Sequence, residues 1–451
     1  MAPPRRLALP AALAAALSVV TASSYCQHNE SASKLMTAPG VEYRMLLNGL
    51  SDPRGLVADA EGNLLVVERG DGGKGVTRVV LDDGHGTHVC VESKTRLVPD
   101  SKLNHGIALS RDGKTLFASS SSDVYAWEYD AVRGKLGSRR HIITGMKQGG
   151  HATRTLLIPE RNPNLLLVSR GSDGNVDKGT TDIESARSQI RVFKLDELLH
   201  ARYPVQYSSA SVLGWGLRNS VGVAQDPSTG NIWSVENSLD GMKRGGRDIH
   251  QSNPGEELNF HGRPDDTYND VYGKNFGYPA CVAIYDESNV GHYPGGAETG
   301  KQMVGDHMPK NWTDGYCREE TVAPRITFES HLAPLDLEFQ DDGAAVYISM
   351  HGSWNRQPGA GYRLSRVSFS DGFPVHEANS RDAEEKVMWN ADESLCPFGC
   401  FRPVGLAMER SGERLFVTSD ATGELFVVTG FKGQYGQSGG KPKSPGGHSS
   451  Y

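Results

Sequence analysis

A short sequence pattern recurs along the chain and constrains its fold more than any single motif does. Each copy has a polar residue, a small residue among apolar ones, a turn rich in Asp and Gly, and a second apolar run. The six copies begin at Asp52, Leu103, His151, Leu217, Ala333 and Arg402. A unit of this size cannot bury its apolar faces alone, so the copies are expected to pack against one another.

Each copy predicts a β-hairpin, because two short apolar runs flank a turn such as Glu61-Gly62-Asn63. The 53 glycines and the lack of long helical periodicity beyond the N-terminus also favour short strands and tight turns. Six hairpins with their partner strands can close radially into an all-β, six-bladed β-propeller, which we assign to residues 25–431. A β-sandwich with coincidental hairpins is the alternative.

The two ends of the chain differ from this pattern. Residues 1–24 combine Arg5 and Arg6 with a short Ala/Leu-rich run and a small-residue exit, which predicts a secretory signal peptide. A retained anchor is the alternative, but no charged stop follows the run. Residues 432–451 are rich in Gly, Ser, Pro and Lys and are expected to be disordered. With N-x-S/T sequons at Asn29 and Asn311, this predicts a secreted, extracellular glycoprotein.

Six cysteines in an exported chain favour disulfides over a metal site. We expect three pairs: Cys396 with Cys400, Cys281 with Cys317, and Cys26 with Cys90. The formal net charge of −7 argues against nucleic acid or an anionic membrane as the main partner.

Polar residues recur just before the first apolar run of the copies, and that run is the expected innermost strand. They would meet at one rim of the channel: Arg54, Asn104 with His105, His151 with Arg154, Arg218 with Asn219, Pro334, and Arg402. His351, in "MHGSWNR", could approach the same cavity. Any one of these groups alone is more often a solvated or hydrogen-bonded rim residue. Several guanidinium groups around a narrow cavity, however, repel one another unless an anion or carboxylates compensate. The pattern therefore predicts a guest with several carboxylates, beside a histidine able to accept a proton.

Several segments resemble quinoprotein sugar dehydrogenases. "GGHATRTLL" (149–157) resembles the G-H-W-T-R-N-L segment of the L-sorbosone dehydrogenase branch. "GWGLRNSVG" (214–222) is similar to that branch's W-G-L-R-N-P-x-G-L segment and to G-H-R-N-P-Q-G of soluble glucose dehydrogenase. "GEELNF", "NFGYP", "HGSWNR" and "RPVGLA" extend the match from Pro53 to about Asp420. The chain also resembles the quinone-binding domain of fungal pyranose dehydrogenases.

The resemblance implies a propeller that holds pyrroloquinoline quinone (PQQ), a tricarboxylate, over a calcium ion. It also implies oxidation of a sugar at its anomeric or aldehyde carbon by hydride transfer to the quinone. His151 would be the catalytic base, with His351 as the competing candidate, and the carbonyls of Ser238 and Leu239 would face the calcium. The expected cofactor-binding residues are Arg54, Asn104, His105, Arg154, Arg218, Asn219, Arg356 and Arg402.

The chain departs from the family pattern in places. Ser238-Leu239 stands where soluble glucose dehydrogenases have Gly-Pro, Ala152 replaces an aromatic residue, and Ser220 replaces a proline. Neither a haem domain nor a carbohydrate-binding module is recognised, so an external electron acceptor (a cytochrome, a quinone or a copper enzyme) is expected. Two other functions remain open. A calcium-dependent propeller lactonase would need a rim rich in carboxylates, and a non-catalytic binding propeller would not need the arginine cluster.

Overall fold

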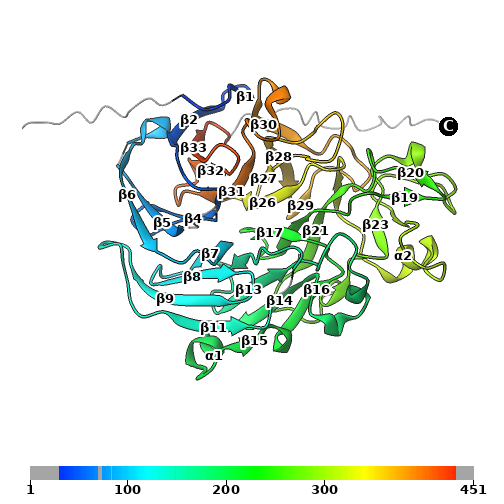
Figure 1. Ribbon diagram of the computed structural model, residues 1–451, viewed down its shortest axis with the longest axis horizontal. Coiled ribbons are helices and arrows are strands. Elements are labelled where there is room, and N and C mark those ends of the chain that lie inside the picture. Colours follow the sequence, from blue (N-terminus) through cyan, green and yellow to red (C-terminus); the bar gives the residue numbers. More distant parts are fainter. Residues whose placement is uncertain (1–29, 70–73, 83, 148, 433–451) are drawn as a thin grey trace, which may run out of the picture.

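The blades of a propeller surround one central axis (Figure 1). The structure is a computed structural model that describes residues 30–69, 74–82, 84–147 and 149–432. Six inner strands surround the axis: β3 (Pro53–Ala58), β7 (Leu103–Leu109), β12 (Leu156–Leu157), β17 (Ser220–Gln225), β26 (Pro334–Phe339) and β31 (Pro403–Met408). Each contacts the inner strands of the neighbouring blades. The predicted all-β, six-bladed β-propeller is confirmed.

Within each blade the later strands lie progressively further from the axis, paired antiparallel except at two short outer strands. Blade one continues with β4 (Leu64–Glu68), β5 (Gly75–Leu81) and β6 (Val91–Val98). Blade two continues with β8 (Thr115–Ser120), β9 (Val124–Asp130), β11 (Arg140–Thr144) and β15 (Val205–Gln206). Blade three continues with β13 (Leu165–Arg170), β14 (Gln189–Lys194), β16 (Ser211–Trp215) and β22 (Lys274–Asn275).

Blades four to six follow the same plan. Blade four continues with β18 (Ile232–Glu236), β21 (Glu256–Gly262) and β25 (Ile326–Phe328). Blade five continues with β27 (Ala345–Met350), β28 (Arg363–Ser370), β30 (Glu385–Asn390) and β1 (Leu35–Thr37). Blade six continues with β32 (Leu415–Ser419), β33 (Glu424–Thr429) and β2 (Glu42–Leu47). Shorter elements are β10 (Lys135–Leu136), β29 (Phe373–Pro374), β19 (Lys243–Arg244), β20 (Arg247–Asp248), β23 (Cys281–Ala283), β24 (Gln302–Val304), α1 (Leu195–His200) and α2 (Asp314–Glu320).

The two ends of the described chain close the ring. β2 pairs antiparallel with β33, in a register that sets Glu42 opposite Thr429. β1 adds to the outer edge of blade five beside β30. The rings of Tyr43 and Phe426 then pack with their centroids 6.3 Å apart. The last blade is therefore completed by a strand from the beginning of the chain.

A ring of small residues lets the inner strands approach one another closely. A Cβ at Gly106 would lie 2.0 Å from the carbonyl oxygen of Arg154, and one at Gly55 would lie 2.4 Å from that of His105. Both distances are far shorter than any real Cβ contact. Glycines at matching positions of the four repeats concerned are Gly55, Gly106, Gly222 and Gly405. The small residue in the repeated pattern is thus a requirement of close packing at the axis.

In the other two blades a side chain makes the connection at this level. The Thr155 hydroxyl donates to the carbonyl of Val221, and the Asp336 carboxylate accepts from the N–H of Leu406. One residue nearer the rim, Val221, Leu335 and Val404 form an apolar cluster across three blades. Beyond the glycine level, a central cavity of about 920 Å³ is lined by the later residues of the inner strands. The rim and this cavity therefore lie toward opposite ends of the inner strands.

Two of the three expected disulfides are present. Cys281 bonds Cys317 and Cys396 bonds Cys400, with Cα atoms 5.6 and 5.1 Å apart. Cys26 lies outside the described residues, as do Asn29, the predicted signal peptide and all of the predicted tail except residue 432. The second sequon residue, Asn311, is exposed. No described helix has the length and apolar character needed to cross a membrane.

Candidate functional site

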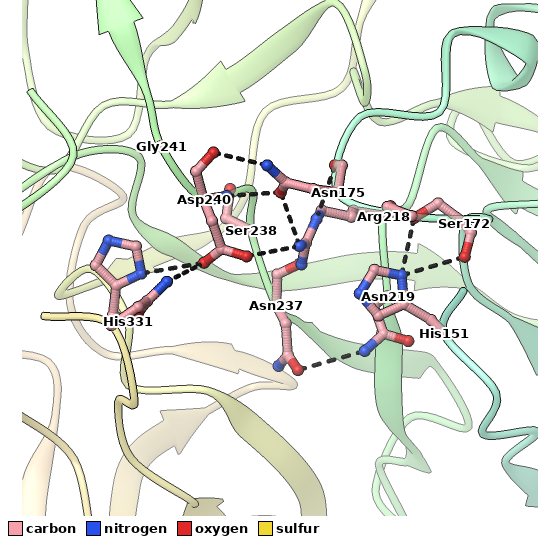
Figure 2. Close-up of polar contacts among 12 residues, drawn as sticks. His151, Ser172, Asn175, Arg218, Asn219, Asn237, Ser238, Asp240, Gly241 and His331 are labelled. Carbon is pink, nitrogen blue, oxygen red and sulfur yellow. Dashed lines mark hydrogen bonds and ion pairs between the residues drawn. The ribbon is translucent and has the colours of Figure 1, made fainter. Parts of the chain in front are cut away.

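Three of the predicted rim residues converge where blades three and four meet. Arg218 and Asn219 directly precede β17, and His151 lies in the segment before β12. A Cβ at Gly171 would lie 2.6 Å from Asn219 Oδ1, 2.8 Å from His151 Cβ and 3.2 Å from the Arg218 carbonyl oxygen. Figure 2 shows the side chains of Asn219 and His151 side by side. The three residues therefore pack around Gly171, where a larger side chain would push them apart.

The hydrogen bonds of His151 fix its tautomer. Its Nδ1 lies 3.2 Å from the Ser172 carbonyl oxygen and 2.9 Å from Ser172 Oγ (Figure 2). The Ser172 hydroxyl itself donates to the Gly174 carbonyl. Because a carbonyl can only accept, Nδ1 carries the hydrogen and Nε2 carries the lone pair. Burial and then the nearby Arg218 charge lower the pKa of His151 to about 4. The imidazole is thus neutral near pH 7 and able to accept a proton at Nε2.

The two glycines before His151 serve the neighbouring loop. The N–H groups of Gly149 and Gly150 donate to Asp173 Oδ1 at 2.9 and 2.6 Å. A Cβ at Gly150 would lie 2.2 Å from the backbone nitrogen of Gly174. The close approach that these glycines permit is therefore to residues 173–174, which carry the segment beside Ser172.

Arg154 holds the His151 segment in place through hydrogen bonds to backbone carbonyls. Its guanidinium is fully buried and donates to the carbonyls of His151 at 2.8 Å and of Met146 at 2.9 Å. We expected Arg154 to contact a cofactor, but these bonds direct it into the protein, where it anchors the loop that carries His151.

Arg218 lies at the centre of a polar network (Figure 2). Its Nη2 donates to Asn175 Oδ1 at 3.0 Å and to Asp240 Oδ2 at 3.1 Å, while Nη1 donates to the Asn237 carbonyl at 3.1 Å. Asn219 Nδ2 donates to Asn237 Oδ1 at 3.4 Å. Side chains from blade three and from the loop after β18 therefore hold the Arg-Asn pair in place.

A second cluster on the rim surrounds Asp420, which follows β32 in blade six. Its Oδ2 accepts from Arg54 Nη1 at 2.7 Å, and its Oδ1 lies 2.8 Å from His351 Nε2. Although burial opposes ionisation, the contact with His351 and then the charge of Arg54 hold the pKa of Asp420 well below its ordinary value. Arg402 Nη2 lies 3.0 Å from His351 Nδ1. Nε2–H donates a hydrogen bond to the Asp420 carboxylate, and Nδ1 accepts one from Arg402. Both ring nitrogens of His351 are therefore engaged.

Carboxylates of the chain supply part of the charge compensation that we expected from a guest. Asp420 pairs with Arg54, and Asp240 pairs with Arg218. Arg54 nevertheless keeps a buried Nε without a hydrogen-bond partner among the described residues. On the next blade, Asn104 Oδ1 and His105 Nδ1 are likewise buried and unpartnered within the described chain. Unpaired polar atoms therefore gather at the rim of blades one and two.

Arg356 differs from the other predicted arginines. Its Nη1 donates to the Ser330 carbonyl at 2.9 Å, and Nη2 pairs with the Glu329 carboxylate. These contacts commit its guanidinium to the segment before blade five, so it does not join either cluster described above.

The loop after β18, residues 237–241, presents carbonyl oxygens without partners. The N–H groups of Ser238, Asp240 and Gly241 are all bonded to side chains of other elements. Within the described chain, the carbonyls of Ser238 and Leu239 accept no hydrogen bond. Among all the described residues, no group of three or more His, Cys, Asp or Glu side chains is placed to hold a metal. Free carbonyl oxygens are, however, suitable ligands for a hard cation.

Sequence reasoning missed the residues that position these groups: Ser172, Asn175, Asp240 and Asp420. Only Asp420 carried a usable signal, because it follows the second strand of its repeat much as His351 does in the fifth. Ser172 and Asn175 belong to the loop between β13 and β14, for which the repeat pattern predicts nothing.

Comparison with known families and proteins adds to this geometry. A family model described as TrAA12-like matches residues 35–431. A pyrroloquinoline quinone-dependent sugar dehydrogenase of Hypocrea jecorina (strain QM6a) is 41% identical over 396 residues, covering 87% of this chain and 89% of that protein. A pyrroloquinoline quinone-dependent pyranose dehydrogenase of Coprinopsis cinerea is 37% identical over 417 residues. That alignment covers 89% of this chain and 55% of the relative, so this chain spans about half of its length.

Solved structures show the same architecture. The calcium structure of the Trichoderma reesei family AA12 enzyme superposes with a TM-score of 0.85 at 41% identity, covering 88% of this chain and 97% of that one. The holo form of the PQQ domain of Coprinopsis cinerea pyranose dehydrogenase superposes with a TM-score of 0.83 at 36% identity, covering 90% and 99%.

Proposed function

The chain belongs to the TrAA12-like family, and from that premise we propose that it oxidises a sugar at its anomeric or aldehyde carbon with PQQ and calcium. Its likeness to the Hypocrea and Coprinopsis enzymes makes it a PQQ-dependent sugar dehydrogenase. The substrate class is an aldose, pyranose or ketoaldose, and the electrons pass to an external acceptor. Secretion to the extracellular space is part of the proposal, supported by residues 1–24 and the two disulfides.

The observation that carries the proposal is the fixed tautomer of His151 beside the Arg218-Asn219 pair. When bound, PQQ supplies a quinone that accepts a hydride from the sugar carbon. His151 Nε2 removes the proton of the hydroxyl on that carbon, which favours departure of the hydride and leaves a carbonyl. Ser172 holds the ring in the base-competent tautomer, and burial keeps it neutral.

The rim residues fit a flat tricarboxylate. Arg54 keeps one guanidinium nitrogen, Nε, without a partner within the described chain, and this N–H group could donate to a carboxylate of the cofactor. Arg218, Asn219 and Arg402 lie on the same rim and would hold further oxygens of the cofactor. The unpaired carbonyls of Ser238 and Leu239 suit calcium, which would neutralise cofactor charge and polarise the quinone.

The lactonase alternative requires carboxylate side chains that are available to a metal. Asp240 and Asp420 are both committed to arginines, and the buried Glu236 and Glu256 accept from backbone N–H groups of the site. The geometry therefore favours the dehydrogenase.

Removal of calcium is expected to abolish activity. Protein treated with a chelator and freed of PQQ should reduce an artificial electron acceptor in the presence of sugar only after both PQQ and calcium are restored. Acceptor reduction in a rigorously metal-free, PQQ-loaded sample would contradict the calcium part. Absence of PQQ binding would contradict the whole proposal.

Replacing Arg54 with alanine is expected to weaken PQQ binding by about 2 kcal/mol, roughly thirtyfold, because a charge-assisted contact to a carboxylate is lost. Titration of PQQ into the apoprotein measures the change. The matched control is Arg356→Ala, which removes an arginine committed to Glu329 and should leave the affinity unchanged. Equal losses in both variants would show that general rim charge, and not Arg54, determines binding.

The loss of kcat/KM on acidification is expected to occur well below pH 6.5. A base is competent only when neutral, and burial with the Arg218 charge lowers the pKa of His151 to about 4. The value of kcat/KM is therefore expected to rise with pH through that pKa and to be level by pH 6.5. An acid limb at or above the ordinary histidine value, measured with saturating acceptor, would contradict this assignment.

A further inference from the structure

We infer that Glu256 positions the calcium loop, residues 237–241, and that its charge strengthens the binding of calcium there. The inference rests on the proposed function, because it concerns the calcium of that site. Glu256 begins β21 in blade four, and its side chain is buried. Nothing in the repeat pattern predicts a role for it.

The two carboxylate oxygens of Glu256 join three segments of the site. Oε2 accepts from the N–H of Ser238 at 2.6 Å, and Oε1 accepts from the N–H of Ala333 at 3.2 Å. The carbonyl of Ala333 in turn accepts from the N–H of His351 at 3.1 Å. One side chain therefore links the calcium loop, the start of the blade-five inner strand and the His351 segment.

Anchoring an N–H group also orients the carbonyl on the same peptide. In a planar trans peptide the N–H and C=O groups point in opposite directions. The Ser238 N–H bonded to Glu256 therefore turns the Asn237 carbonyl the other way, where it accepts from Arg218 Nη1 at 3.1 Å. In the next peptide but one, the Asp240 N–H bonds to Asn175 Oδ1 at 2.8 Å, so the Leu239 carbonyl points away from Asn175. Glu256 thus fixes the first peptide of the loop, and Asn175 fixes the third.

No ion pair among the described residues includes Glu256, and Arg218, whose positive charge acts on it, is itself paired with Asp240. Glu236 and Glu257 place two more buried carboxylates in the same blade. A buried carboxylate without a counter-charge is costly. A divalent cation on the Ser238 and Leu239 carbonyls would relieve that cost through a weakly screened interaction. Carbonyl ligands carry no net charge, so the adjacent carboxylate would add the attraction that they lack.

The test is the calcium dependence of Glu256→Gln in the full chain. Glutamine keeps the size of the side chain and one accepting oxygen, but it removes the charge. With PQQ present, we expect the calcium midpoint to rise by about tenfold or more, as for other groups that orient metal ligands. The readouts are the absorbance of bound PQQ and the calcium-induced rise in Tm. At saturating calcium, the kcat of the variant should return close to that of the parent protein, although its calcium midpoint stays raised.

Glu257→Gln is the matched control. Glu257 is the next residue of β21, is also buried, and accepts from Asn259 Nδ2 at 3.0 Å without contacting the calcium loop. Its calcium midpoint should equal that of the parent protein. If Glu256→Gln does not fold, Glu256→Asp takes its place. This variant keeps the charge but shortens the reach, so its midpoint should rise by less than tenfold yet measurably.

An unchanged midpoint in a folded Glu256 variant, or a loss of kcat that saturating calcium does not restore, would overturn the inference. Failure of the parent protein itself to bind calcium or PQQ would instead overturn the proposed function, so the two failures are distinguishable.

Discussion

Replacing His151 with alanine is expected to reduce kcat by at least about a hundredfold, because a positioned general base contributes on the order of a hundredfold to ten-thousandfold. The imidazole is neutral, and Ser172 directs its Nε2 lone pair as the proton acceptor. Binding of PQQ and calcium should remain close to normal, since the Arg218 and Asp420 clusters are held by other residues. Steady-state rates with PQQ titration measure both quantities.

His351→Ala is the informative comparison. Both nitrogens of His351 are engaged, by Asp420 and Arg402, so this change should disturb the packing of the rim arginines and weaken PQQ binding. At saturating PQQ its rate should stay well above that of His151→Ala. The reverse order, with a near-normal rate for His151→Ala and a collapsed rate for His351→Ala, would move the base to His351.

Replacing Gly106 with alanine is expected to destabilise the whole propeller by about 3 kcal/mol, the upper range for overpacking a close contact. The new Cβ would lie 2.0 Å from the Arg154 carbonyl oxygen and 2.5 Å from Ser119 Oγ, so the inner strands of two blades would have to separate. Because the entropy of unfolding grows with chain length, the Tm of a domain of this size should fall by roughly 3 to 4 °C. Thermal unfolding followed by circular dichroism provides the measurement.

Gly149→Ala controls for the loss of a glycine in itself. A Cβ there would meet only Asp173 Oδ1, at an ordinary 3.6 Å. Its Tm should change by no more than about 1 °C, because a methyl group in uncrowded space has little effect on the free energy of unfolding. A drop as large as that of Gly106→Ala would mean that close packing at the axis is not the cause.

The repeat pattern predicts the fold because four of the six copies place a glycine at the same level of the axis. Gly55 and Gly106 lie where a Cβ would meet the neighbouring inner strand, so a local sequence feature reports a ring-wide constraint. The rim histidines and arginines could be predicted because they lie at the start of those strands or a few residues before it. Two of the disulfides also followed from spacing.

The partners of the rim residues could not be predicted in this way, because they reach the site from different blades. Asp420 meets Arg54 across a separation of 366 residues, and Asn175 meets Arg218 across 43. The directions of Arg154 and Arg356 were also beyond the pattern. Each lies in a segment near the rim, yet its guanidinium is directed to the Met146 carbonyl or to Glu329. Position along a repeat does not determine the direction of a long side chain.

The closure of blade six has a consequence for the order in which this protein can mature. The β2 strand leaves the ribosome early, but its partner β33 is synthesised only after the other strands of the propeller, with Glu42 opposite Thr429. Until then β2 has an unpaired edge, which is prone to pair with other chains. The ring can therefore close only after nearly the whole propeller has been translated. We expect nascent chains that stop before β33 to remain open and to depend on chaperones, however complete their first five blades are.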